Sequence, residues 1–313
     1  MTSDEGSARP KSLESLAQAE ESHSSQLPDS LTVDPRPAAG PDTYQNPELT
    51  TPNLPEAFYR ELGAGRFEST EATAGPWSPK AQHGGPPSAL VGRMMERHDP
   101  RPGSHIARVT VELVRPVPVA EVQVVVRTLR SGRSTELLEG EILADGQPVL
   151  LARAWRIVDS PAHTPRLRHE PSPPPLPGPQ PAESMTGAHT AGYLSAMEWR
   201  FAPGQGFNIP GPGSAWLRQR IPLLAHEPDT GLTRALTVAD SSWAVAFELD
   251  HVRDLVINTD VTLALHREPV GEWLCLTSST AAHPVAGALA SGRLDDAEGD
   301  CGRILQTLLV AGR

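Results

Sequence analysis

The same alternating pattern occurs twice in this chain, 152 residues apart. In VTVELVRPV (residues 109–117) the alternate residues Val109, Val111 and Leu113 are apolar, and in VTLALHREPV (residues 261–270) the same holds for Val261, Leu263 and Leu265. A period of two is typical of a strand that buries one face. Val109 then corresponds to Val261, so we predict an internal duplication. This duplication constrains the fold strongly, because both copies must build the same set of elements.

Further strands and a closing hairpin follow the alternating stretch in both copies. Residues 121–134 correspond to residues 271–287, and a last pair of strands completes each copy. The hairpins turn at Asp145-Gly146 and at Glu298-Gly299, where glycine tolerates the backbone of a tight turn. Each copy is therefore expected to contain about four antiparallel strands.

One helix precedes the strands of each copy. In the first copy, QHGGPPSALVGRMMER at residues 82–97 places two prolines where the first helical turn needs no amide donors. Its apolar face follows as Leu90, Val91, Met94 and Met95. In the second copy, residues 230–247 carry apolar side chains at helical spacing, and we expect one helix that includes Asp240.

Two segments fall outside the repeats. Residues 1–50 carry nine acidic and three basic side chains with Tyr44 as their one aromatic residue, so we predict a disordered acidic tail. Nine of the twenty-one residues in 161–181 are proline, which favours a stiff, extended connector. The predicted organisation is the tail, an N-terminal domain at 53–158, a proline-rich linker at 159–182 and a C-terminal domain at 183–312.

Charge and composition argue against several classes of protein. The net charge is −11, and no basic stripe is present to neutralise phosphates, so we expect no nucleic-acid partner. No secretion signal begins the chain and no apolar run approaches roughly 18 residues, so we expect a cytoplasmic protein without a membrane span. Cys275 and Cys301 lie in no metal-binding motif and are expected to be buried free thiols. The assembly state, including a homo-oligomer, stays open.

The order of these motifs resembles the double hotdog fold of acyl-CoA thioesterases of the thioesterase II type. In the first copy the likeness rests on GPWSPKAQHGGPPSALV, VELVRPVP and RSGRS. In the second copy it rests on VADSSW, INTDVTLALHREPVGEWL and DAEGDCGRILQTLLV, and together these stretches cover most of residues 53–312. The resemblance implies an α+β fold, a tandem double hotdog in which each unit is a long helix wrapped by an antiparallel sheet. It also implies hydrolysis of an acyl-CoA substrate to free acid and CoA, without a metal, a cofactor or a covalent intermediate.

The same resemblance implies a site that holds a water molecule. The family uses an aspartate, a threonine or serine, and a glutamine, which together hold the water that attacks the thioester carbonyl. Asp240 matches the aspartate and Gln306 the glutamine, whereas the hydroxyl position falls on Asn258. Thr259 is the next residue, but neighbours on a strand face opposite ways. The catalytic candidates are therefore Asp240, Gln306, Asn258 and Thr259.

These residue types suit the chemistry of hydrolysis. A carboxylate is ionised at neutral pH and can accept a proton from water, while an amide can orient that water. Uncovered N–H groups at a helix N-terminus can stabilise an oxyanion. We therefore expect Gly84 and Gly85 to bring their amides close to the substrate, with His83 beside them. The two repeats would then contribute parts of one site.

Two other functions stay open. A non-catalytic hotdog protein could bind acyl-CoA or another acyl thioester, if Asn258 has displaced the water. A hotdog dehydratase or hydratase would need a histidine base paired with a carboxylate, for which the sequence offers no compelling match. Each candidate also has a structural alternative: Asp240 could face solvent, Gln306 and Asn258 could be ordinary polar residues of strands, and Gly84-Gly85 could be a tight turn.

Overall fold

The computed structural model describes residues 53–167, 171–249 and 253–312. They belong to one compact unit, Leu49–Arg313. The acidic tail predicted at residues 1–50 lies outside the described residues. Among the described helices, none has the length and apolar character that crossing a bilayer requires.

The first repeat begins with two short hairpins and the first helix, and ends with four long strands. Its elements are β1 (Tyr59–Gly63), β2 (Arg66–Ser69), β3 (Ala74–Gly75), β4 (Ser78–Gln82), α1 (Gly85–Arg97), β5 (Ser104–Leu113), β6 (Glu121–Ser131), β7 (Thr135–Ala144) and β8 (Gln147–Val158). The second repeat has three more short helices and seven strands. Its elements are α2 (Tyr193–Ala196), β9 (Met197–Phe201), β10 (Gly213–Gln219), α3 (Gly231–Ala239), α4 (Ser242–Val245), β11 (Asp254–Asn258), β12 (Asp260–Leu265), β13 (Leu274–His283), β14 (Gly287–Asp296) and β15 (Gly299–Gly312).

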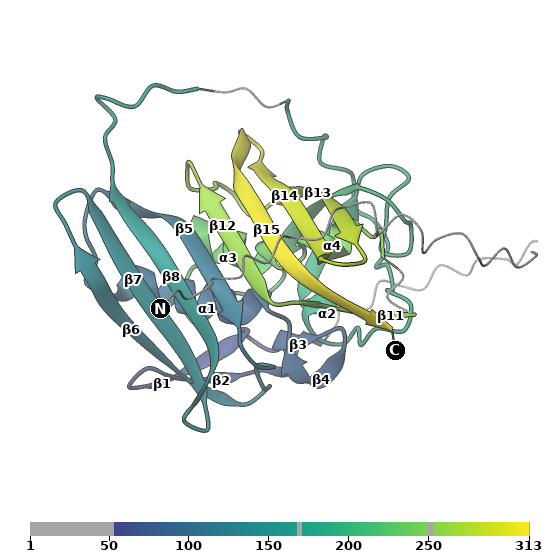
Figure 1. Ribbon diagram of the computed structural model, residues 1–313, viewed down its shortest axis with the longest axis horizontal. Helices are drawn as coiled ribbons and strands as arrows, with labels where there is room; N and C mark the ends of the chain where they lie inside the picture. Colours follow the sequence, from purple (N-terminus) through teal and green to yellow (C-terminus); the bar gives the residue numbers. More distant parts are fainter. Residues whose placement is uncertain (1–52, 168–170, 250–252, 313) are drawn as a thin grey trace, which may run out of the picture. The chain divides into compact units, whose positions relative to one another are not determined.

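One sheet connects both repeats. Within the described residues it contains thirteen strands, in the order β1-β2-β6-β7-β8-β5-β12-β15-β14-β13-β10-β9, with β11 also paired to β15. The ladders of this sheet are antiparallel, and β3 and β4 form a separate pair. Figure 1 shows β5 of the first repeat beside β12 of the second, near the middle of the sheet.

The strands that repeat each other in the sequence also pair with each other. Thr110 lies directly opposite Thr262, 152 positions away, and their hydroxyl oxygens are 3.3 Å apart. Because the ladder is antiparallel and its centre joins equivalent residues, a local twofold axis passes through this pair. The alternation predicted from the sequence is confirmed, since Val109, Val261 and Leu263 are at most 1% exposed.

Helix α1 forms as predicted, with Pro86 and Pro87 in its first turn and Leu90 and Val91 fully buried. Helix α3 runs antiparallel to it, because the start of α1 meets the end of α3 and the hydroxyl of Thr230, at the start of α3, donates to Glu96 at 3.0 Å. Figure 1 shows both helices behind the long sheet.

The second helix differs from the prediction. The sequence pattern predicts one helix over residues 230–247 that includes Asp240, but α3 ends at Ala239 and α4 begins at Ser242. Asp240 is the C-cap residue of α3, so it lies at the break and not within a continuous helix. Periodicity did not reveal the break because the apolar spacing continues across it; a side chain from β15, described below, bonds to the backbone there.

Candidate active site

Asp240 lies at the break between α3 and α4, and its side chain is only 4% exposed. Four hydrogen-bond donors surround its carboxylate. The Nδ2 atom of Asn258 lies 2.6 Å from Oδ1, and Nε2 of Gln306 lies 3.2 Å from the same oxygen. The backbone N–H groups of Gly84 and Gly85 also donate to the carboxylate. The solvent-facing alternative for Asp240 therefore does not apply.

Gln306 is fully buried on β15 and bonds to both sides of the helix break. Its Nε2 donates to the backbone carbonyl of Asp240 at 3.1 Å, and its Oε1 accepts from the backbone N–H of Trp243 at 3.1 Å. One amide thus satisfies backbone groups that a continuous helix would pair internally. Gln306 thereby fixes the position of Asp240 as well as donating to its carboxylate.

His83 lies on the other side of the carboxylate, at the end of β4. Its Nδ1 is 3.1 Å from Oδ2 of Asp240 and 3.1 Å from the backbone nitrogen of Gly85. Its ring stacks on Tyr193, with centroids 3.7 Å apart and planes 4° from parallel. Burial lowers the pKa of His83 from 6.5 to about 3, so the imidazole is neutral at physiological pH.

The environment of Asp240 changes its acidity strongly. Burial raises the pKa of its carboxyl from 3.8 to about 7, although the four surrounding donors favour the charged form. A carboxyl with a pKa near 7 changes its protonation state close to neutral pH. It can therefore accept a proton from water and return it within one reaction cycle.

Gly84 and Gly85 pack directly against the end of α3 and the Asp240 side chain. A Cβ atom on Gly84 would lie 2.8 Å from Oδ2 of Asp240, and one on Gly85 would lie 2.3 Å from the backbone oxygen of Thr237. The glycines thus allow α1 to begin directly against the end of α3. Their amides donate to the Asp240 carboxylate, and their contact with a substrate stays a prediction.

The structure separates Thr259 from the other candidates. Its side chain is exposed, and its Oγ1 lies 3.3 Å from the backbone oxygen of Thr307 and 3.4 Å from Asp260. Asn258, one residue earlier, bonds to Asp240 instead. The two side chains thus point to opposite sides, as expected for neighbouring residues of a strand. The structure therefore brings six of the candidates together: Asp240, Gln306, Asn258, His83, Gly84 and Gly85.

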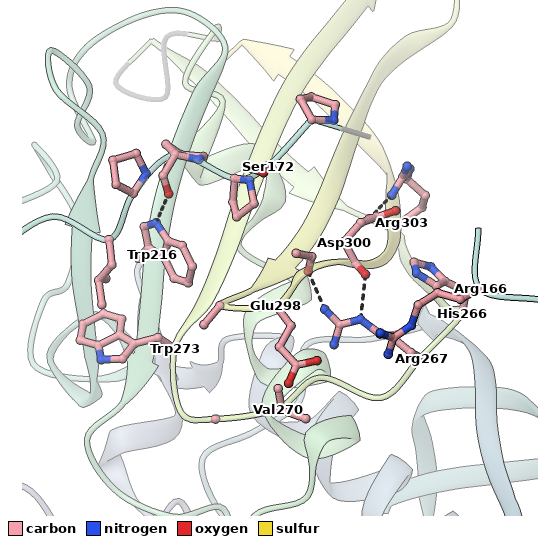
Figure 2. A pocket seen from close by; sticks show the side chains of 18 of the residues that line it. Arg166, Ser172, Trp216, His266, Arg267, Val270, Trp273, Glu298, Asp300 and Arg303 are labelled. Atoms are coloured by element: carbon pink, nitrogen blue, oxygen red, sulfur yellow. Dashed lines mark hydrogen bonds and ion pairs between the residues drawn. The ribbon is translucent and has the colours of Figure 1, made fainter. Parts of the chain in front are cut away.

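Two cavities lie away from this cluster. One of about 1000 Å³ lies between the proline-rich linker and the loops of the second repeat; Figure 2 shows Trp216 and Trp273 on one side of it and Arg267 and Asp300 on the other. Another of about 340 Å³ is lined by residues such as Glu96 and Glu268. Asp240 lines neither. Around it, His83, Gly84 and Asn258 are partly exposed.

Sequence reasoning did not identify Tyr193, which the structure places against His83 and the end of α3. The residue is 0% exposed and begins α2, directly after the linker and a short loop. No motif marks it in the sequence. The one feature that could have drawn attention to it is the rarity of tyrosine, since the chain contains only three.

Comparison with solved structures shows the fold. An acyl-CoA thioesterase II from Mycobacterium marinum is 15% identical, with a TM-score of 0.59 over 82% of this chain and 95% of the other. A proposed thioesterase II from Thermobifida fusca is 16% identical, with a TM-score of 0.63 over 82% and 96%. A hotdog protein of unknown function from Alicyclobacillus acidocaldarius is 15% identical, with a TM-score of 0.61 over 81% and 96%. The fold is therefore of the hotdog type.

Comparison with protein families shows the class of enzyme, while a comparison with curated proteins gives no significant match. Residues 73–157 match the acyl-CoA thioesterase N-terminal domain. Residues 165–310 match the acyl-CoA thioesterase C-terminal domain. These two matches cover most of the chain and leave out the acidic tail. The chain therefore belongs to the acyl-CoA thioesterase family, and it is a thioester hydrolase.

Proposed function

We propose that this protein hydrolyses an acyl-CoA thioester with a water molecule activated by Asp240. The observation that carries the proposal is the arrangement around that carboxylate, which is buried, has a pKa near 7, and receives hydrogen bonds from Asn258 and Gln306. General bases in enzymes are often buried carboxylates that accept several hydrogen bonds and have a pKa close to neutral pH.

We also propose that the chain is a tandem double hotdog. Its units would span residues 53–158 and 183–312, joined by the proline-rich linker at 159–182. The local twofold axis at Thr110 and Thr262 supports this organisation, because duplicated units that pack edge to edge are related by such an axis. The site then needs both units, because the start of α1 in the first unit contacts the carboxylate of Asp240, which follows α3 in the second unit.

Hydrolysis follows from the chemistry of these groups. Water loses a proton to the Asp240 carboxylate as its oxygen attacks the thioester carbonyl carbon, and the carbonyl electrons move onto the oxygen. Collapse of this tetrahedral intermediate breaks the carbon–sulfur bond and releases CoA, whose sulfur takes up a proton from the Asp240 carboxyl. The free acid leaves from the other side of the broken bond. No covalent bond to the protein forms in this sequence.

Asn258 replaces the hydroxyl that the family resemblance expects at this position. Its Nδ2 already donates to Oδ1 of Asp240 at 2.6 Å, and a carbonyl oxygen with two lone pairs remains on the same side chain. That oxygen can accept a hydrogen from the reacting water. The amide therefore combines stabilisation of the base with orientation of the nucleophile.

Release of the CoA thiol from acyl-CoAs of several chain lengths tests this function. We expect Asp240→Asn to lower kcat by about 100-fold or more, because the substitution keeps the shape and removes the base. Asp229→Asn is the matched control, since burial also raises the pKa of that carboxyl but its bonds go to the Leu223 amide and Gln219. Wild-type kcat in Asp240→Asn would show that the assignment of the base is wrong.

The same experiment separates hydrolysis from binding alone. If the wild-type protein binds acyl-CoA in a calorimeter but releases no thiol, the chain is a binding protein and the proposed hydrolysis is wrong. Asn258→Thr would then be expected to gain activity, because it restores the hydroxyl of the family. If the wild type is active, Asn258→Thr should at most match it.

A further inference from the structure

Tyr193 connects three parts of the molecule that meet at the proposed site. It begins α2, after the linker between the repeats, and its side chain is fully buried. Its ring contacts His83 from the first repeat, and its hydroxyl contacts the backbone at the end of α3 in the second. Neither contact belongs to the water-activating group formed by Asp240, Asn258 and Gln306.

The hydroxyl of Tyr193 bonds on both sides of Asp240. It donates to the backbone oxygen of Thr237 at 2.8 Å and lies 2.9 Å from Oγ of Ser241. The backbone N–H of Ser241 bonds to Val238, one residue after Thr237, because the helix tightens as it ends. The Thr237 carbonyl is thus left for a side-chain donor, and Tyr193 provides it.

The ring of Tyr193 fixes the plane of His83. The two rings are 3.7 Å apart and nearly parallel, and this plane places Nδ1 of His83 3.1 Å from Oδ2 of Asp240. Rotation of the imidazole about its Cβ–Cγ bond would tilt its plane, which would separate these two atoms and break the stacking contact. The position of the tyrosine ring therefore determines the direction in which His83 meets the carboxylate.

The surroundings of Tyr193 leave its ring little freedom. Trp199 meets it edge-on at 6.3 Å, and Phe58 lies 6.5 Å away on a tilted plane. The preceding residue, Gly192, packs so closely on β3 that a Cβ atom there would lie 2.2 Å from the backbone oxygen of Ala74. The segment that carries Tyr193 is therefore packed against the first repeat, while the Tyr193 hydroxyl bonds to the second repeat at the end of α3.

We propose that Tyr193 is a positioning residue of this hydrolase, which holds His83 and the helix end bearing Asp240 in the geometry that hydrolysis needs. The proposal rests on the proposed role of Asp240 as the base. Tyr193 itself does not act as an acid or base, because burial raises its pKa further above 10 and keeps the phenol protonated. Among the described residues, Asp240 interacts with the titratable side chains of His83 and Tyr193 and with the neutral side chains of Asn258 and Gln306.

Two substitutions separate the hydroxyl from the ring. Tyr193→Phe keeps the stacked ring and removes both hydroxyl contacts, so we expect kcat to fall about tenfold, with KM changed by less than about twofold. Tyr193→Leu also removes the stack, and we expect a fall of about 100-fold. It should also shift the acid limb of the pH–kcat profile downward, because loosened packing admits water to Asp240 and weakens the desolvation that raises its pKa.

A purely structural role would give a different result. The control is Trp216→Phe. Trp216 is a buried aromatic residue away from Asp240, and the substitution removes the hydrogen bond that it donates to the backbone oxygen of Pro174. It should lower the thermal midpoint, through the lost bond and the smaller ring, and leave kcat and the acid limb unchanged. If the Tyr193 variants lose thermal stability but keep wild-type kcat and acid limb, or if Trp216→Phe lowers kcat equally, the inference is wrong.

Failure of the proposed function would look different from failure of this inference. Asp240→Asn in the same assay reports on the base alone, so wild-type kcat in that variant contradicts the role of Asp240. Loss of kcat in Asp240→Asn together with unchanged Tyr193 variants contradicts only the positioning role. Tyr193→Phe removes a single oxygen and keeps the packing of the ring, so it decides the question even if Tyr193→Leu fails to fold.

Discussion

Removal of the Asn258 side-chain amide should change the pH at which this enzyme works. In the structure its Nδ2 lies 2.6 Å from Oδ1 of Asp240, closer than Nε2 of Gln306 at 3.2 Å. This bond favours the charged carboxylate, whereas burial favours the neutral form. Asn258→Ala removes the donor and leaves the burial. Asp240 should therefore hold its proton to a higher pH.

The size of this effect follows from the strength of the bond. A hydrogen bond to a charged group contributes about 1.5–3 kcal/mol, and about 1.4 kcal/mol corresponds to one pKa unit. The acid limb of the kcat profile should therefore move upward by about 1 to 2 pH units. With the pKa of Asp240 starting at about 7, roughly half of the enzyme is active at pH 7. After the change only about 1–10% would be, so kcat at pH 7 should fall about 5- to 50-fold.

The assay is CoA thiol release between about pH 5.5 and 9.5 at saturating acyl-CoA, with Asn208→Ala as the control. Asn208 bonds through its side chain to the backbone of Ser184 and Thr186, away from the site. We expect the activity of Asn258→Ala to rise again at alkaline pH, to a plateau below the wild type because the water-orienting oxygen is also lost, while Asn208→Ala follows the wild type at every pH. An acid limb at the wild-type pH in Asn258→Ala would refute the reasoning, because the amide would then have no effect on the base.

Three further expectations concern stability. Between about pH 4 and 7 the folded protein keeps a proton on Asp240 that the unfolded chain releases, so the free energy of unfolding falls by up to about 4 kcal/mol as pH rises. Asp240→Asn removes this loss, so its thermal midpoint should exceed that of the wild type at pH 8 and approach it near pH 4; equal midpoints at both pH values would contradict the raised pKa. Gly85→Ala should cost about 1–3 kcal/mol in urea unfolding, since its Cβ would meet the Thr237 carbonyl, whereas Gly178→Ala, which has open space, should cost little. Deletion of residues 1–50 should leave the midpoint nearly unchanged, since their composition offers little apolar surface to a core, and a large drop would show that they dock.

Local patterns in the sequence were sufficient to predict the repeated elements. The alternation at Val109 and Val261 predicted strands because one face of each is buried, and the prolines before Leu90 predicted the start of α1. The offset of 152 residues predicted the duplication, and the same offset separates Thr110 from Thr262 at the centre of the sheet. These features depend on residues close together in the chain, or on a period that the chain repeats.

The geometry around Asp240 could be decided only by the folded chain. The break after α3 is held by Gln306, which lies 63 residues beyond Trp243 and leaves no trace in the periodicity of the helix. Position 84 needs glycine because the Asp240 side chain packs against it, and Tyr193 is important because its ring stacks on His83. In both cases the contacting residue lies more than 100 positions away in the sequence. A hydrogen bond or a close approach between distant segments depends on both partners, and neither segment alone determines where the other will lie.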